Sequence, residues 1–179
     1  PFSISGRTAL VTGGAKGIGR ACAEALAAAG AQVIIADMDE AAGHATAQAL
    51  GGSFVRLNVT RKSEVDTVAA EITRQHGALD ILVNNASAIN LTGTLETEMK
   101  RFDLMNQVNA RGTFLCSKVA IPHLANASNG HILNLSPPLN MDKRWFAPHV
   151  AYTMAKYGMS MCVLGMAEEF KAHTIAVNA

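Results

Sequence analysis

The chain has 179 residues, of which 49% are hydrophobic and 16% charged, and its formal net charge is +1 at pH 7. This length and composition allow one well-buried core and are too short for two comfortable domains, so we expect a single domain over residues 1–179. No stretch concentrates Lys and Arg, which argues against a nucleic-acid partner, and no apolar run is long enough to cross a membrane. The three widely spaced cysteines indicate reduced thiols and a cytoplasmic protein.

Short apolar runs alternate with segments of helical spacing along the whole chain. The predicted strands are residues 8–12, 32–36, 53–57, 79–83, 131–135 and 174–177. The predicted helices are residues 18–29, 39–50, 62–76, 98–124 and 151–170. Strands rich in Val, Ile and Leu with helices between them indicate an α/β fold, a doubly wound parallel sheet of the Rossmann-like kind.

A glycine-rich segment, TGGAKGIG at residues 12–19, joins the first predicted strand to the first predicted helix. Gly13, Gly17 and Gly19 allow the backbone to turn tightly and to approach a pyrophosphate without a Cβ in the way, and the helix N-terminus adds oriented N–H groups. The alternative is an ordinary glycine-rich turn. The strand before it, the helix after it and an acid further on favour dinucleotide binding.

That acid is Asp37, at the end of the second predicted strand. A carboxylate there accepts hydrogen bonds from the adenosine ribose hydroxyls and repels a 2′-phosphate. Asp37 could instead cap the next helix, but Asp39 is better placed for that cap. Lys16 could attract a 2′-phosphate, so NADP stays an alternative to the favoured cofactor, NAD.

Two further motifs accompany the glycine loop: Asn84-Asn85-Ala86 after the fourth predicted strand, and Tyr152-Thr153-Met154-Ala155-Lys156 on a later helix. Together they resemble the short-chain dehydrogenase/reductase family over essentially the whole chain. From about Leu79 onward the sequence is similar to a narrower branch, the hydroxysteroid dehydrogenase-like type 2 proteins, whereas the first half resembles ordinary NAD-dependent members. The resemblance implies hydride transfer between NAD(H) and a small-molecule secondary alcohol or carbonyl substrate.

Tyr152 and Lys156 are four residues apart, so they lie on one face of their helix. An ammonium beside a phenol favours the phenolate, so we expect Lys156 to lower the pKa of Tyr152. The resemblance implies that Tyr152 is the general acid/base and that Lys156 is its electrostatic partner and holds the nicotinamide ribose. The alternative is a surface Tyr–Lys pair on an amphipathic helix.

The resemblance implies two further catalytic positions. Asn109 matches an Asn that bends its helix locally and holds a water in the proton relay, with Asn106 as the alternative. A Ser after the fifth strand would hydrogen-bond the substrate oxygen, but Pro137 occupies the matching slot and Ser136 stands one residue early. A shift of one residue in a strand turns the side chain to the other face. Ser136 serves only if the prolines redirect the backbone; otherwise the site lacks an oxyanion donor, which raises the barrier by ~3 kcal/mol.

The remaining expectations complete the cofactor site. Asn58-Val59 matches a position that contacts adenine, and Ser87 replaces the usual Gly after the Asn-Asn-Ala turn. The expected cofactor-binding residues are Gly13, Lys16, Gly17, Ile18, Gly19, Asp37, Met38, Asn58, Val59, Asn85, Ala86, Tyr152 and Lys156. The scattered histidines lack metal-ligand spacing, so no metal is expected.

The resemblance also implies a homodimer or homotetramer through helices 98–124 and 151–170. Members of the family continue past the position of residue 179 into a segment that covers the substrate, so the chain is expected to be truncated at its C-terminus. A nucleotide-binding module with impaired catalysis is therefore the competing hypothesis.

Overall fold

Six parallel strands form one sheet in the order β3-β2-β1-β4-β5-β6. The computed structural model describes residues 3–179. The strands are β1 (Thr8–Thr12), β2 (Gln32–Asp37), β3 (Ser53–Arg56), β4 (Ile81–Asn84), β5 (Gly130–Asn134) and β6 (Ile175–Asn178). The predicted doubly wound, Rossmann-like parallel sheet is confirmed.

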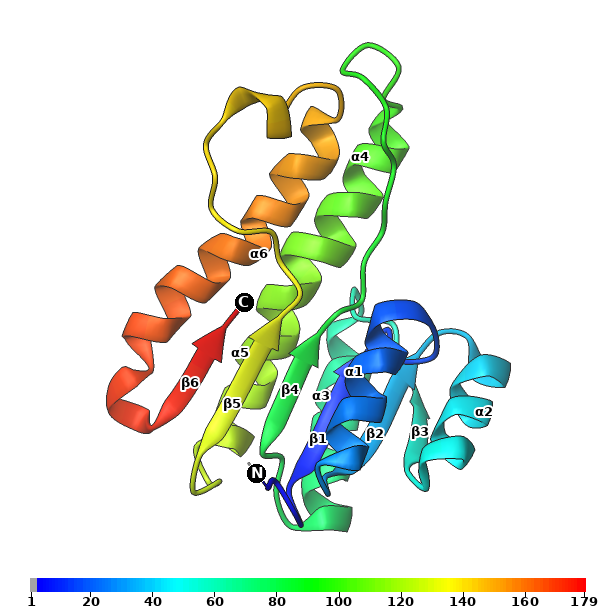
Figure 1. Cartoon of the computed structure of the whole chain (residues 1–179), viewed down its shortest axis with the longest axis vertical. Coiled ribbons are helices and arrows are strands. Elements are labelled where there is room, and N and C mark those ends of the chain that lie inside the picture. Colours follow the sequence, from blue (N-terminus) through cyan, green and yellow to red (C-terminus); the bar gives the residue numbers. More distant parts are fainter. Residues whose placement is uncertain (1–2) are drawn as a thin grey trace.

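Helices cover the sheet in two layers (Figure 1). They are α1 (Gly17–Ala28), α2 (Glu40–Leu50), α3 (Lys62–His76), α4 (Met99–Met105), α5 (Gly112–Leu124) and α6 (Val150–Glu169). Short helical turns occur at Asn106–Arg111, Lys143–Trp145 and Lys171–His173. The single helix predicted over residues 98–124 is therefore interrupted: a π-helical segment, Asn106–Arg111, separates α4 from α5.

Each strand sends alternate side chains to opposite faces, and this alternation builds two cores. On β1, Leu10 belongs to the larger core, which includes residues of α3, α5 and α6, whereas Val11 belongs to the smaller core with Ala23 and Ala47. Burial of both faces explains why these strands read as continuous apolar runs.

The order of the strands places a crevice at the carboxyl ends of the central strands. β1 pairs with β2 on one side and with β4 on the other, so the chain crosses over between these neighbours. In such sheets, ligands bind outside the carboxyl ends of the strands at this switch point. The loops after β1, β2 and β4 meet there (Figure 1).

Candidate active site

The glycine loop is packed tightly against the loop that follows β4. A Cβ at Gly13 would lie 2.9 Å from Ala86 Cα and from Asn85 Nδ2. A Cβ at Gly19 would collide with the Gly13 carbonyl oxygen and with Asn85. Gly13 and Gly19 are therefore required by close packing within the protein.

Gly17 serves a different purpose. It has a φ of +55°, which favours glycine, yet no atom of the described residues lies within 4 Å of the position that a Cβ would occupy. Gly17 is also the first residue of α1, where unpaired N–H groups point away from the helix. The loop thus leaves an open cradle at a helix N-terminus, which fits the phosphates of a dinucleotide.

Asp37 lies at the carboxyl end of β2 and faces the crevice. Its carboxylate accepts hydrogen bonds from the backbone N–H of Ala15 at 3.1 Å and of Asp39 at 3.0 Å. Asp39 caps α2, as predicted, by accepting from the backbone N–H of Ala42 at 3.0 Å. Each oxygen of Asp37 keeps further acceptor capacity for a ribose hydroxyl.

Lys16 is directed to Asp39. Its ammonium lies 2.6 Å from the Asp39 carboxylate, and this hydrogen-bonded partner raises the pKa of Lys16 and lowers the pKa of Asp39. Both side chains are exposed. Lys16 is absent from the lining of the crevice, so the cofactor contact predicted for it has no support in its position here.

The crevice beside the glycine loop has a volume of about 450 Å³. It is lined by Gly13, Ile18, Asp37, Met38, Leu57, Asn58, Val59, Asn85, Ala86, Ser87 and Val108. Most predicted cofactor positions thus meet around one cavity. Sequence reasoning missed Leu57 and Val108 as lining residues because neither carries a polar group that a motif could single out.

Asn58 stands in a tight turn at this crevice. Its side-chain oxygen accepts hydrogen bonds from the backbone N–H of Thr60 at 3.0 Å and from the Thr60 hydroxyl at 2.8 Å. Its backbone N–H donates to Glu64 at 2.9 Å. The carboxamide nitrogen is the polar group of this side chain that is left for an adenine contact.

Asn84 and Asn85 are neighbours in sequence, but their side chains contact different parts of the protein. Asn85 Nδ2 donates to the carbonyl oxygens of Thr12 at 3.1 Å and Gly13 at 2.9 Å, which fixes the glycine loop. The buried Asn84 Nδ2 donates to Ser117 Oγ at 3.0 Å and to Asn134 Oδ1 at 2.7 Å. Asn85 therefore holds the glycine loop, whereas Asn84 links β4 to α5 and β5.

Asn109 occupies the π-helical segment and is fully buried. Its side-chain oxygen accepts from the backbone N–H of Ala88 at 2.7 Å, and its amide nitrogen donates to the Ala88 carbonyl oxygen at 2.9 Å. Asn106 turns back to its own helix and donates to the Phe102 carbonyl oxygen at 2.9 Å. Of the two alternatives, Asn109 is the one that reaches the loop after β4.

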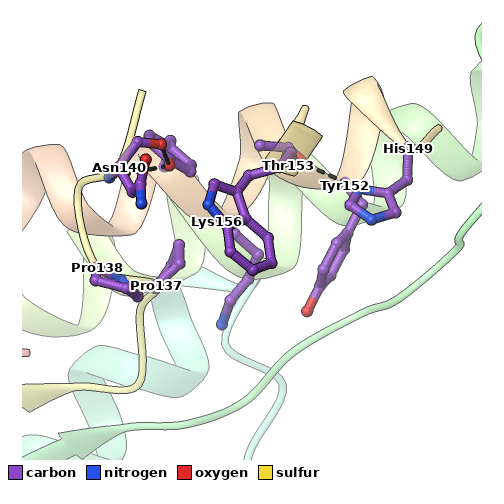
Figure 2. A pocket seen from close by; sticks show the side chains of 9 residues that line it. Pro137, Pro138, Asn140, His149, Tyr152, Thr153 and Lys156 are labelled. Carbon is purple, nitrogen blue, oxygen red and sulfur yellow. Dashed lines mark hydrogen bonds between the residues drawn. The ribbon is translucent and has the colours of Figure 1, made fainter. Parts of the chain in front are cut away.

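Tyr152 and Lys156 project from α6 into a second cavity of about 340 Å³. Figure 2 shows both side chains on the same side of the helix, opposite Pro137 and Pro138. The Lys156 ammonium donates to the Leu135 carbonyl oxygen at 2.5 Å, at the end of β5. The helical spacing thus places the predicted pair on one wall of a pocket.

The expected effect of Lys156 on Tyr152 is wrong for this structure. Burial raises the pKa of Tyr152, and the opposing influence comes from the neighbouring Ser87 hydroxyl. Burial also lowers the pKa of Lys156. Ser87 lines the crevice and the adjacent Ala88 packs in the same cluster as Tyr152, so the loop after β4 connects the two sites.

Pro137, and not Ser136, faces the cavity that holds Tyr152. Pro137 and Pro138 line this cavity, whereas Ser136 does not. The Ser136 hydroxyl is buried and has no hydrogen-bond partner among residues 3–179. The prolines do not redirect Ser136 into the pocket, so the structure does not support the catalytic position predicted for it.

His149 and Thr153 also line this cavity and were not predicted as site residues. Their spacing from Tyr152 on the same helix could have indicated them, because residues 149, 152, 153 and 156 share one helical face. His149 lies at the N-terminal end of α6, and its ring centroid is 6.2 Å from that of Tyr152.

Between residues 3 and 179, no group of three or more His, Cys, Asp or Glu side chains could hold a metal ion. Over the same residues, no helix is both long and apolar enough to cross a membrane.

The glycine loop, the Asp37 crevice and the Tyr152–Lys156 pocket occur together in one class of enzymes. The model of the short chain dehydrogenase family matches residues 7–179, and the chain therefore belongs to that family of oxidoreductases, which typically bind NAD(P).

Among curated relatives, hydroxysteroid dehydrogenase-like protein 2 from Danio rerio is 50% identical. The alignment is 189 positions long and covers 98% of this chain and 45% of that protein. The protein of the same name from Homo sapiens is 48% identical, with coverage of 98% and 45%. The likeness thus extends over the first half of the chain, which had been predicted to resemble other members. The chain spans less than half the length of these relatives.

Solved structures show the same fold. A short chain dehydrogenase from Mycobacterium thermoresistibile is 39% identical and superposes with a TM-score of 0.89, covering 98% of this chain and 67% of that one. A protein from Xanthomonas campestris is 43% identical with a TM-score of 0.92, covering all of this chain and 72% of that one.

Proposed function

We propose that the chain transfers a hydride between NAD(H) and an apolar secondary alcohol or the corresponding carbonyl compound. The observation that carries this proposal is the junction of the two cavities. The crevice that contains Asp37 extends to Ser87, and the adjacent Ala88 packs in the same cluster as Tyr152, which lines the second cavity. A dinucleotide along the crevice would bring its reactive end to the group best suited to move a proton.

The residues present fit a nicotinamide dinucleotide. The open space at Gly17 and the start of α1 suits the pyrophosphate, and Asp37 suits the adenosine ribose. The carboxylate favours NAD, because it repels a 2′-phosphate. Lys16, the side chain that could attract that phosphate, is paired with Asp39. When bound, the cofactor supplies or accepts the hydride; the chain orients it and moves the proton.

Tyr152 is the proposed general acid/base, since its phenol lies in the substrate cavity and is a far stronger acid than the serine hydroxyl beside the junction. In carbonyl reduction its phenol gives a proton to the substrate oxygen, and in alcohol oxidation its phenolate takes one. The raised pKa of Tyr152 favours the neutral phenol, which is the form required for reduction. Lys156 and Asn109 are proposed to position this proton relay.

The second cavity favours an apolar substrate. Pro137, Pro138 and Trp145 form part of its lining. The relatives carry a name that refers to hydroxysteroids, which are apolar alcohols, and this agrees with the lining. Substrate burial against these side chains would supply binding free energy roughly in proportion to the apolar area removed from water.

Titration and turnover test the proposal. NADH should raise the melting temperature of the purified chain more than NADPH does at equal concentration.

Tyr152→Phe should abolish NAD-dependent oxidation of a panel of secondary alcohols while leaving NADH affinity within about twofold. Tyr157→Phe is the matched control, because Tyr157 lies in the same cavity but donates its hydroxyl proton to the Asn140 carbonyl oxygen. Loss of cofactor binding along with turnover in Tyr152→Phe would contradict the assigned role.

A nucleotide-binding module without efficient catalysis is the second candidate function. The observation that favours it is the position of Ser136, outside the cavity, with Pro137 in the wall. Under this hypothesis the chain binds NADH but oxidises no alcohol of the panel. Turnover that depends on Tyr152 would exclude it.

We also propose assembly into a homodimer or homotetramer through α4, α5 and α6. These helices expose large apolar side chains, namely Leu104, Phe114, Met154, Met161 and Leu164. Such side chains cluster at interfaces between subunits. Light scattering should give a mass that is a multiple of the chain, and Phe114→Lys together with Leu164→Lys should reduce it to one chain.

A further inference from the structure

His149 stands in the cavity that the proposed function uses for substrate, one helical turn before Tyr152. Its ring lies edge-on to the Tyr152 ring, with an interplanar angle of 87° and a centroid separation of 6.2 Å. Figure 2 shows His149 at the start of α6, beside Tyr152 and on the same side of the helix as the phenol hydroxyl. A substrate next to Tyr152 is therefore within reach of this imidazole.

The hydrogen bonds of Thr153 fix which nitrogen of His149 carries the proton. The Thr153 hydroxyl donates its one proton to the Trp145 carbonyl oxygen at 3.1 Å. The same oxygen lies 3.0 Å from His149 Nδ1, so it must accept from an Nδ1–H group. The neutral ring then has no proton on Nε2, and Nε2 is a hydrogen-bond acceptor.

Other polar groups of the cavity are already engaged. The Tyr157 hydroxyl donates to the Asn140 carbonyl oxygen, and the Lys156 ammonium donates to the Leu135 carbonyl oxygen. His149 Nε2, by contrast, has no hydrogen-bond partner among the described residues. His149 Nε2 is not a buried atom, so it is open to the cavity and free to accept a hydrogen bond from a ligand there.

We infer that His149 determines substrate specificity by accepting a hydrogen bond from a second hydroxyl group of the substrate, while Tyr152 acts on the first. The preferred substrate is thus a compound with an apolar carbon skeleton and two hydroxyl groups. When the reaction runs as a reduction, it is the corresponding hydroxy-ketone. This inference rests on the proposed function. Sites that hydrogen-bond a substrate hydroxyl discriminate against analogues that lack it, because the polar group of the site is then left unpaired.

The tautomer of His149 can be measured without any substrate. Protein labelled with ¹⁵N-histidine and saturated with NADH should show, at pH 8, one ring protonated on Nδ1 whose signals vanish in His149→Phe. Thr153→Ser should keep this tautomer, and Thr153→Val should move the ring toward Nε2–H, since valine accepts no hydrogen bond. A wild-type His149 protonated on Nε2 would overturn the inference.

The second experiment compares cyclohexane-1,4-diol with 4-methoxycyclohexanol and cyclohexanol. The diol should shift the His149 Nε2 resonance of the cofactor-saturated protein, and the two other alcohols should not. Where these alcohols are oxidised, kcat/KM should favour the diol about tenfold, which corresponds to a hydrogen bond of ~1.4 kcal/mol. His149→Phe, which keeps an aromatic ring against Tyr152, should abolish that preference.

His44→Phe is the matched control, because His44 packs with its ring tilted against Phe54, outside the lining of the cavity that holds Tyr152. It should keep both the preference and the shift. A wild-type protein in which all three alcohols give equal shifts, or none, would overturn the role of His149. The proposed function fails on a different result, the absence of NADH binding or of Tyr152-dependent turnover with any alcohol.

Discussion

The side chain of Asn109 hydrogen-bonds both main-chain polar groups of Ala88, accepting from its N–H at 2.7 Å and donating to its carbonyl oxygen at 2.9 Å. This double contact ties the π-helical segment Asn106–Arg111 to the loop after β4. Ala88 also packs in the cluster that contains Met105, Ala151 and Tyr152. Asn109 thus positions the residues on which the proposed acid/base rests.

Asn109→Ala should destabilise the protein by about 2–3 kcal/mol, because it leaves the polar groups of Ala88 without partners in a partly buried place. Urea denaturation gives the free energy of unfolding. Asn106→Ala, which removes only a bond to the Phe102 carbonyl oxygen, is the control and should cost less than 1 kcal/mol. An equal decrease in the free energy of unfolding in the two variants would show that the contact with Ala88 contributes no more than the bond from Asn106.

Ser87→Ala should move the pH dependence of alcohol oxidation to higher pH. Burial raises the pKa of Tyr152 and the Ser87 hydroxyl lowers it, so removal of that hydroxyl raises the pKa further. Oxidation needs the phenolate and therefore gains rate only at the higher pH. The measurement is kcat/KM against pH, with Ser87→Thr as the variant that keeps a hydroxyl. An unchanged profile would show that Ser87 does not act on the phenol.

Pro137→Ser should increase turnover. Pro137 lines the wall opposite Tyr152, so a serine there would present a hydroxyl to the substrate oxygen. One such donor contributes up to ~3 kcal/mol to transition-state stabilisation. Steady-state kinetics of wild type, Pro137→Ser and Pro137→Ala separate the hydroxyl from the loss of the ring. A gain of the same size in Pro137→Ala would attribute the effect to backbone freedom.

Asp37→Ser should bring the affinities for NADH and NADPH together, with at least a tenfold change in their ratio. The carboxylate that would repel a 2′-phosphate is removed, while a serine can still accept from the Ala15 N–H. Fluorescence titration with both reduced nucleotides provides the two dissociation constants. Glu24→Gln removes the same charge on the outer part of α1, where Glu24 pairs with Arg20, and should leave the ratio unchanged. An undiminished NADH preference in Asp37→Ser would show that the discrimination between NADH and NADPH does not depend on the Asp37 carboxylate.

Gly19→Ala should weaken NADH binding and destabilise the fold by about 1–3 kcal/mol, because the added Cβ collides with the Gly13 carbonyl oxygen and Asn85. Thermal unfolding with and without NADH measures both effects. Gly165→Ala is the matched helical control, since within residues 3–179 no atom lies within 4 Å of its Cβ position. It should be neutral or stabilise by up to ~1 kcal/mol. A Gly19→Ala protein that behaves like Gly165→Ala would contradict the close packing.

The local patterns of the sequence predicted the sheet, the glycine loop, the position of Asp37 and the shared helical face of Tyr152 and Lys156, because each depends on short-range regularities; the roles of the last two came from the resemblance to a family. Apolar runs indicate buried strands, a glycine before a helix indicates a turn, and a spacing of four residues places two side chains on one helical face. The resemblance to a family implied the position of Asn109 and a local bend of its helix, but no local pattern indicated that the bend is a π-helical segment. That segment depends on hydrogen bonds between Asn109 and Ala88, which are 21 residues apart.

The tertiary structure alone decided which polar groups remain available in the site. It pairs the Lys16 ammonium with Asp39 and the Lys156 ammonium with the Leu135 carbonyl oxygen, and it buries the Ser136 hydroxyl where no described residue hydrogen-bonds it. It also raised the pKa of Tyr152 by burial, against the expectation from a neighbouring lysine. Hydrogen-bond partners and desolvation arise from segments distant in the chain, and no local pattern of residues encodes them.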